Sequence, residues 1–164
     1  MRKKTNSRKD KFLSSIPVAS FDSKNDLIAG KCKFNFSYMD KNQDAGQDFR
    51  DWNHEQLYKL LDKLQNYCKQ PLKYWNTQRV GGGSNKVFEI YGEFPRKSEF
   101  IHPKHVPHDA RWARFRMEGA MRLVGFIVPD ELQDCECKHT KIRFDTNTFY
   151  IVFLDANHKF YITK

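Results

Sequence analysis

The sequence predicts an α+β fold in which N-terminal helices pack on a small antiparallel β-sheet. Apolar residues recur with helical spacing in the first half of the 164 residues, and the second half holds short apolar runs separated by turn-like segments. A chain of this length fits one domain. We therefore expect a single α+β domain over residues 16–164, preceded by a basic, flexible tail over residues 1–15.

The first ordered element expected is a strand over residues 31–40. Every second residue of KCKFNFSYMD is apolar from Cys32 to Tyr38, which is typical of a strand with one buried face. From residue 52 to residue 69 the spacing becomes helical, and six residues form one apolar stripe: Leu57, Leu60, Leu61, Leu64, Tyr67 and Cys68. Asn53 can cap this helix with Gln56 as its reciprocal partner, and Pro71 ends it or begins a second short helix.

The second half of the chain predicts the sheet. Strands are expected over residues 87–94, 112–117, 122–128, 148–154 and 159–162. Glu118 and Gly119 form a tight turn between two of them. Helices are expected on one face of this sheet, with the other face available for a ligand.

Positive charge is concentrated in two segments. The net charge of +9 comes from +5 in residues 1–11 and +4 in residues 94–122, and the rest of the chain is balanced. Such a distribution favours polyanion binding, because each neutralised phosphate releases a counterion. The alternative is a solvated basic face that maintains solubility. The candidate nucleic-acid contacts are Arg96, Lys97, Lys104, Arg111, Arg114, Arg116 and Arg122.

Three of these arginines are expected to lie close together. Arg114 and Arg116 are two residues apart on one strand, so both point to the same face. The turn after residue 117 brings Arg122 beside one of them. Clustered guanidinium groups repel unless an anion lies between them. Alternatively, they form ion pairs with Glu93, Glu118 or Asp155.

Histidine and tyrosine supply candidate acid–base groups. His102, His105 and His108 lie in a proline-containing loop, where they could transfer protons, contact phosphate, bind a metal or serve the loop structure. We take His105 as the candidate among them. His158 and Tyr161 near the C-terminus would suffice for metal-free RNA cleavage beside arginines. Alternatively, His158 is only a residue of a turn and Tyr161 is only an aromatic residue of the sheet.

The cysteines do not predict a cofactor. None of the four forms a C-x-x-C pair, so we expect reduced thiols. Cys135, Cys137 and His139 have zinc-ligand side chains, but their spacing is narrower than in structural zinc sites. A polar loop between two strands is the preferred interpretation, and neither metal nor cofactor is expected.

Membrane and secretory classes are not supported by the sequence. The chain has no apolar run long enough to span a bilayer, and its basic first residues lead into no apolar core. We therefore expect a cytoplasmic protein without a membrane partner.

The C-terminal half, residues 87–164, resembles the RelE/ParE-like toxins of bacterial toxin–antitoxin pairs. The resemblance rests on early helices, an Arg-rich strand, RLVGFIV and TFYIVFLDANHKFY. It implies a RelE-like fold, ribosome-associated mRNA as substrate and an antitoxin-like partner. It also implies phosphate contacts for Arg114, Arg116 and Arg122, with His158 and Tyr161 near the cleavage site. The long N-terminal portion and the HPKHVPH loop depart from that family.

Most of residues 32–161 also resembles an uncharacterised family of bacterial hypothetical proteins, which implies no activity. The first hypothesis is therefore a basic nucleic-acid-binding protein that is a metal-independent endoribonuclease of toxin type. The alternatives are a non-catalytic RNA- or DNA-binding protein, or a protein-interaction module of a bacterial mobile element or defence locus. The sequence leaves open whether the protein is an enzyme.

Overall fold

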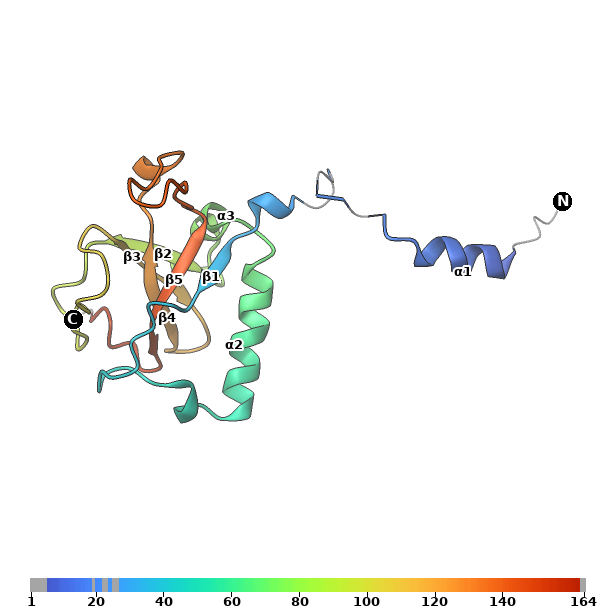
Figure 1. The fold of residues 1–164 in the computed structure, drawn as a ribbon. Helices are drawn as coiled ribbons and strands as arrows, with labels where there is room; N and C mark the ends of the chain where they lie inside the picture. The colour runs from blue at the N-terminus through green and yellow to red at the C-terminus, as the bar shows by residue number, and fades with distance from the viewer. Residues whose placement is uncertain (1–5, 19, 22–23, 25–26, 163–164) are drawn as a thin grey trace.

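Strands from the second half of the chain and one short early strand build a mixed sheet that carries helices on one face (Figure 1). The computed structural model describes residues 6–18, 20–21, 24 and 27–162. The helices of this part are α1 (Ser7–Ser15), α2 (His54–Tyr67) and α3 (Leu72–Thr77), with short 3-10 turns at Ile28–Gly30, Phe49–Asp51 and Asp130–Leu132. Its strands are β1 (Lys33–Asn35), β2 (Phe88–Gly92), β3 (Arg111–Arg116), β4 (Arg122–Ile127) and β5 (Thr148–Asp155). The α+β class is confirmed.

The sheet is not wholly antiparallel. Its order is β1-β5-β4-β3-β2, and β2 to β5 pair antiparallel as expected. β1 instead runs parallel to β5, with Lys33 opposite Thr148. The sequence pattern could not reveal this pairing, because β1 and β5 are separated by the helices and by three strands. Parallel neighbours require such a long connection.

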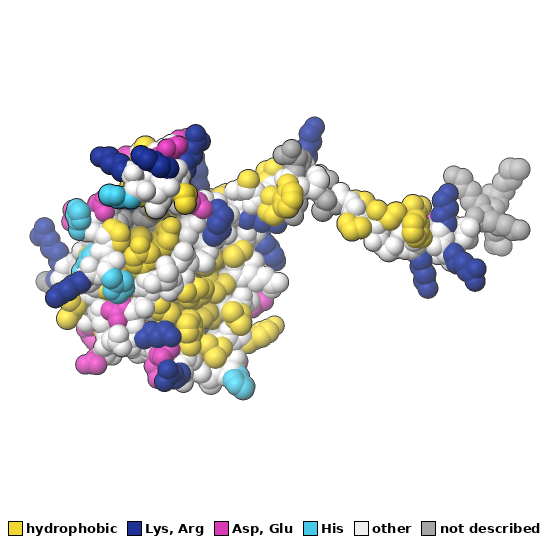
Figure 2. Space-filling model, in the orientation of Figure 1, with side chains coloured by type: hydrophobic (Ala, Val, Ile, Leu, Met, Phe, Trp, Pro, Cys, Tyr) yellow, Lys and Arg dark blue, Asp and Glu magenta, His cyan; other side chains and the backbone are white. Residues whose placement is uncertain are grey.

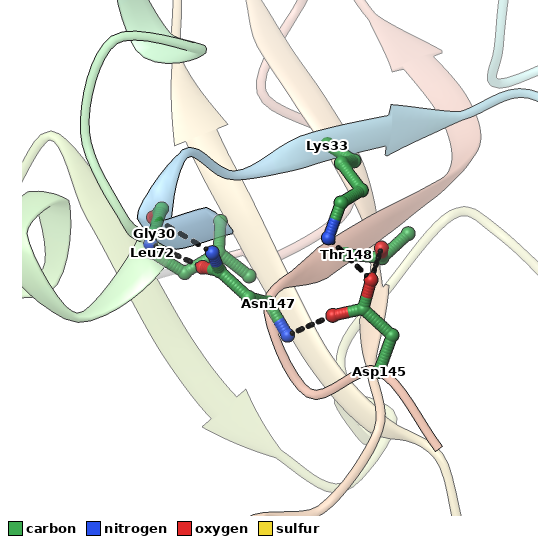
Figure 3. A network of polar contacts seen from close by, with 6 residues as sticks. All are labelled: Gly30, Lys33, Leu72, Asp145, Asn147 and Thr148. Atoms are coloured by element: carbon green, nitrogen blue, oxygen red, sulfur yellow. Dashed lines mark hydrogen bonds and ion pairs between the residues drawn. The ribbon is translucent and has the colours of Figure 1, made fainter. Parts of the chain in front are cut away.

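A polar network fixes the parallel pairing (Figure 3). The Asn147 side chain accepts a hydrogen bond from the Leu72 N–H and donates one to the Gly30 carbonyl, each 2.9 Å long. Asp145 pairs with Lys33 at 2.6 Å and accepts the Thr148 hydroxyl at 3.0 Å. The chain before β1, the start of α3 and the start of β5 are thereby joined at one point.

Helix α2 forms as its sequence predicts. Asn53 and Gln56 make the expected capping box, with the Asn53 side chain 2.9 Å from the Gln56 N–H. Leu60, Leu64 and Tyr67 are buried against the sheet. Leu61, which belongs to the predicted stripe, is 64% exposed. The buried face of the helix is therefore narrower than predicted.

The opposite face of the sheet is largely covered, although an open face was expected. Residues 94–110 and the C-terminal segment pack on it and form a second core, which we call the loop-side core. Its largest buried side chains are Phe100, Trp112, Phe126, Phe153 and Phe160. Arg116 and Arg122 lie at one end of this face, beyond the core, and the candidate site is there.

The predicted last strand does not form. Residues 159–162 instead run beside the loop residues Lys97 and Glu99. The Glu99 N–H donates to the Lys159 carbonyl, and the Ile162 N–H donates to the Lys97 carbonyl, each at 3.1 Å. The C-terminal segment therefore lies over the sheet face as an extended chain rather than at its edge.

Helix α1 stands away from the sheet and buries no residue (Figure 1). Residues 7–15 belong to the segment predicted as a basic, flexible tail, and the structure describes them as a helix, which the sequence analysis did not assign. Figure 2 shows basic side chains on this helix beside hydrophobic ones. Phe12 and Leu13 of α1 are more than half exposed. The predicted tail residues 1–5 lie outside the described residues. Neither α1 nor another helix in the described ranges has the length and apolarity needed to cross a bilayer.

Strand β4 is buried along its whole length between β3 and β5, and Gly125 makes this close packing possible. A Cβ atom at Gly125 would lie 2.0 Å from the Tyr150 carbonyl oxygen. A register shift at the same point leaves Val152 without a partner on β4. Backbone in the centre of a sheet cannot move away without breaking ladder hydrogen bonds.

We predict that Gly125→Ala lowers the free energy of unfolding by about 3 kcal/mol or more, because the new methyl group overlaps the Tyr150 backbone. Urea denaturation measures this change. Gly82→Ala is the matched control, since nothing lies within 4 Å of the added Cβ there, and it should stay within about 0.5 kcal/mol of wild type. A folded Gly125→Ala protein of wild-type stability would contradict the close approach of β4 and β5.

Candidate functional site

The β3–β4 hairpin brings two arginines face to face. Arg116 ends β3 and lies directly opposite Arg122, which begins β4. The Met117 N–H donates to the Met121 carbonyl, so the turn between the strands spans residues 118–120 and is one residue longer than the predicted Glu118-Gly119 turn. Asp155 lies opposite Arg122 on its other side, at the end of β5. Directly opposed like charges destabilise a sheet. Arg122 thus lies between a like charge on β3 and an opposite charge on β5. We call Arg114, Arg116 and Arg122 the arginine cluster.

Arg114 is fully engaged by the protein itself. It is 5% exposed, and each of its three guanidinium nitrogens donates a hydrogen bond. Nη2 pairs with Glu89 at 2.7 Å, Nη1 reaches the Lys86 carbonyl at 3.0 Å, and Nε reaches the Tyr91 hydroxyl at 3.1 Å. Arg114 therefore forms an ion pair, as the alternative interpretation of the cluster expected. Its partner is Glu89 rather than Glu93, Glu118 or Asp155. Arg114 supports the site more than it contacts a ligand.

Arg122 is buried but only partly satisfied. It is 7% exposed, and Nη1 donates to the Gly119 and Met121 carbonyls at 2.8 Å each. Its Nε is buried and has no hydrogen-bond partner among the described residues. Burial, followed by the charges of Arg114 and Arg116, lowers the pKa of Arg122 to about 10. The side chain remains cationic near neutral pH and keeps an unused donor for an anion.

Asp155 determines the path of the chain after β5. Its carboxylate is fully buried and accepts three backbone hydrogen bonds. Oδ1 accepts the N–H groups of Asn157 and Lys159 at 3.2 and 2.9 Å, and Oδ2 accepts the Phe160 N–H at 2.9 Å. The turn is thereby closed, and the C-terminal segment is directed back across the sheet face.

His158 lies within this turn with a φ of 58°. Histidine tolerates this left-handed region better than most residues with a side chain. Burial lowers the pKa of His158 below 6.5, and the positive charges of Arg122 and Arg114 lower it further, against the opposing charge of Asp155. The imidazole is therefore neutral at pH 7 and able to accept a proton beside a buried guanidinium.

Tyr161 stacks on Tyr91 at the rim of the arginine cluster. The two rings are nearly parallel, with an interplanar angle of 3° and centroids 4.8 Å apart. The inner ring, Tyr91, receives the Arg114 Nε hydrogen bond. Tyr161 is 41% exposed. Two of the predicted catalytic residues, His158 and Tyr161, are thus brought to the arginine cluster by one turn.

The third predicted catalytic residue, His105, lies apart from the arginine cluster. Its Nε2 donates to the Tyr38 carbonyl at 3.0 Å, and its ring stacks on the Tyr38 ring. Tyr38 packs on Phe126, four residues along β4 from Arg122, which is roughly 13 Å by strand geometry. The structure does not bring His105 to His158.

The loop around His105 serves the loop-side core. His102 packs against Phe94 and Trp112, with ring centroids 5.4 and 5.3 Å apart, and Val106 is buried. Loop structure, one of the roles left open by the sequence, accounts for His102 and His105.

The other predicted nucleic-acid contacts are dispersed. Arg96 and Lys97 are exposed beside the C-terminal segment, and Lys104 is exposed on the covering loop. Arg111 lies at the far end of β3 and pairs with Asp130 at 3.5 Å. Arg111 is an odd number of residues away from Arg114 and from Arg116. Its side chain therefore points to the opposite face of the sheet. Arg111 is therefore not part of the cluster.

The cysteine-containing loop between β4 and β5 does not gather metal ligands. Across the described ranges, no three His, Cys, Asp or Glu side chains lie close enough to hold a metal ion. Hydrogen bonding from the Thr140 side chain and backbone lowers the pKa of Cys137. Cys135 is exposed.

Sequence reasoning missed Glu89 and Tyr91 as supporting residues. Both lie on β2, where Glu89 is directly opposite Arg114. The sequence shows that Glu89 and Tyr91 are two residues apart and therefore lie on the same face of β2. It does not show that β2 pairs with β3. Asp155 was expected to be an ion-pair partner and to begin a turn, but its three backbone hydrogen bonds were not predicted.

Comparisons with protein-family models, curated proteins and solved structures found no match.

We predict that Asp155→Asn lowers the free energy of unfolding by about 2 kcal/mol. The amide group would oppose buried N–H donors with its own N–H groups, and an unpaired buried donor is costly. Thermal or urea denaturation checks this value. Asn157→Ala, at an exposed position of the same turn, should change stability by less than about 0.5 kcal/mol. Equal stability of both variants would refute the anchoring role of Asp155.

We also predict that the His158 pKa, followed by NMR of its imidazole protons, lies below 6.5 and rises in Arg122→Gln. Removing a nearby positive charge favours the protonated ring. Lys63→Gln, on α2 across the sheet, should leave the value unchanged. An unchanged His158 pKa in Arg122→Gln would show that the two groups do not interact.

Proposed function

We propose that this protein is a metal-independent endoribonuclease of toxin type that binds RNA at the arginine cluster. The observation that carries this proposal is the buried Arg122, whose Nε has no partner among the described residues, beside His158 with its lowered pKa. A buried guanidinium with an unused donor favours a phosphate oxygen as its partner. The resemblance of residues 87–164 to RelE/ParE-like toxins supports the same activity, with mRNA as substrate and an antitoxin-like partner.

The proposed reaction is transesterification within RNA. Neutral His158 takes the proton from a ribose 2′-hydroxyl, whose oxygen then attacks the adjacent phosphorus. The bond from phosphorus to the 5′-oxygen breaks, and that oxygen takes a proton from the Tyr161 hydroxyl. The products are a 2′,3′-cyclic phosphate and a 5′-hydroxyl. Solvent then returns the proton to Tyr161 and removes the one on His158.

The arginines have distinct roles in this reaction. Arg116 and Arg122 lie opposite each other, so a phosphate between them relieves their repulsion and is stabilised as negative charge develops on its oxygens. Arg114 is a positioning residue, because its three nitrogens are already bonded to Glu89, Tyr91 and Lys86. Binding of the anion costs little reorganisation, because these groups are held in place beforehand.

We predict that purified protein, with or without ribosomes, cleaves RNA in the presence of a chelator. His158→Asn and Arg122→Gln should slow cleavage about tenfold or more, since they remove the base and the phosphate donor. Asparagine is chosen because it tolerates the positive φ. A single 2′-deoxy substitution should block cleavage at that position only.

His54→Asn, at the exposed start of α2, is the matched control and should cleave as wild type does. RNA that stays intact in both assays contradicts the catalytic proposal. If intact RNA is nevertheless bound in a salt-sensitive manner, the non-catalytic RNA-binding alternative is favoured. Expression in a bacterial host tests the toxin class, since growth arrest should occur with wild type and disappear in an Arg116→Gln, Arg122→Gln double variant.

A further inference from the structure

The stacked tyrosines have a geometry that the cleavage reaction alone does not require. Proton donation by Tyr161 needs only its hydroxyl, yet its whole ring lies flat on Tyr91. The pair is supported from beneath, because the Tyr91 hydroxyl accepts a hydrogen bond from Arg114, which is itself held by Glu89. Three side chains thus support the plane of one partly exposed ring.

Tyr161 keeps part of its surface exposed. One side of its ring stacks on Tyr91, and the residue is nevertheless 41% exposed. Its backbone is also fixed, since the neighbouring Ile162 N–H donates to the Lys97 carbonyl. A flat, immobile aromatic surface gains stacking energy at little entropic cost.

Charges flank this surface on two sides. Tyr91 lies close enough to Arg114 and Arg122 for their charges to lower its pKa, although burial dominates and raises it overall. On the other side, the exposed Arg96 and Lys97 lie along the backbone that pairs with the C-terminal segment. An RNA chain with one phosphate at Arg122 can therefore continue across Tyr161 toward Arg96 and Lys97.

We infer that Tyr161, supported by Tyr91, is a nucleobase-stacking site that selects unpaired RNA. The inference rests on the proposed function, because it takes RNA as the ligand of the same site. Bases in a duplex are stacked on one another and cannot lie on a protein ring, whereas unpaired bases can. Stacking requires only a π-face, so the site accepts any base.

The test is a binding experiment with RNA that cannot be cleaved. A fluorescent single-stranded 2′-O-methyl oligonucleotide, the same strand with abasic positions, and the matching duplex are titrated with protein, and anisotropy gives each Kd. Wild type should bind the single strand about tenfold more tightly than the abasic strand, and the duplex weakly.

The variants separate the ring from its hydroxyl. Tyr161→Phe and Tyr161→Trp should bind the single strand within about twofold of wild type, whereas Tyr161→Ala should bind about tenfold more weakly. On the abasic strand, Tyr161→Ala and wild type should have equal affinity. A merely structural role for Tyr161 would weaken binding of both strands alike. Tyr58→Ala, at an exposed position on α2, is the control for loss of a surface aromatic.

Arg122→Gln distinguishes failure of this inference from failure of the proposed function. Wild type that binds no RNA, or Arg122→Gln that binds as wild type does, overturns both. If binding depends on Arg122 but Tyr161→Ala binds as wild type, or loses affinity equally on the abasic strand, only the stacking site is overturned. Duplex bound as tightly as single strand also overturns the stacking site.

Discussion

The hydrogen bonds of the buried Asp155 carboxylate determine where the candidate site is assembled. Three backbone N–H groups of the following turn converge on it, so the chain leaves β5 and crosses the sheet face instead of extending the edge. His158 is thereby placed beside Arg122, Phe160 enters the loop-side core, and Tyr161 reaches Tyr91. A carboxylate buried without these donors would carry a large desolvation cost.

The arginine cluster combines structural and unsatisfied charges. Glu89 and Tyr91 hold Arg114, so its charge is balanced within the protein. Arg122 shares the same face but retains a buried donor that has no partner in the described part of the chain. The cluster thus combines one arginine with complete hydrogen bonding and one with incomplete hydrogen bonding. The incomplete bonding of Arg122 is the basis of the proposed anion site.

Local patterns predicted much of this site. The turn expected after Met117 predicted Arg122 beside Arg114 or Arg116, and the structure decided for Arg116, because the turn spans residues 118–120 and thereby sets the register. The capping box of α2 was equally local. The contact between His105 and Tyr38 was not predicted, since the two residues are 67 positions apart in the chain. Nothing near His105 in the sequence indicates that contact.

The sequence by itself determined the α+β class, the helix boundaries near Asn53 and Pro71, and the strand pair that carries the arginines, because each depends on spacing within a few residues. Only the tertiary structure decided the parallel place of β1, the covering of the second sheet face and the stacking of Tyr161 on Tyr91. These features join residues far apart in the chain. Their formation depends on which buried polar groups form hydrogen bonds and on how side chains fill the core. The local spacing of apolar residues predicts neither.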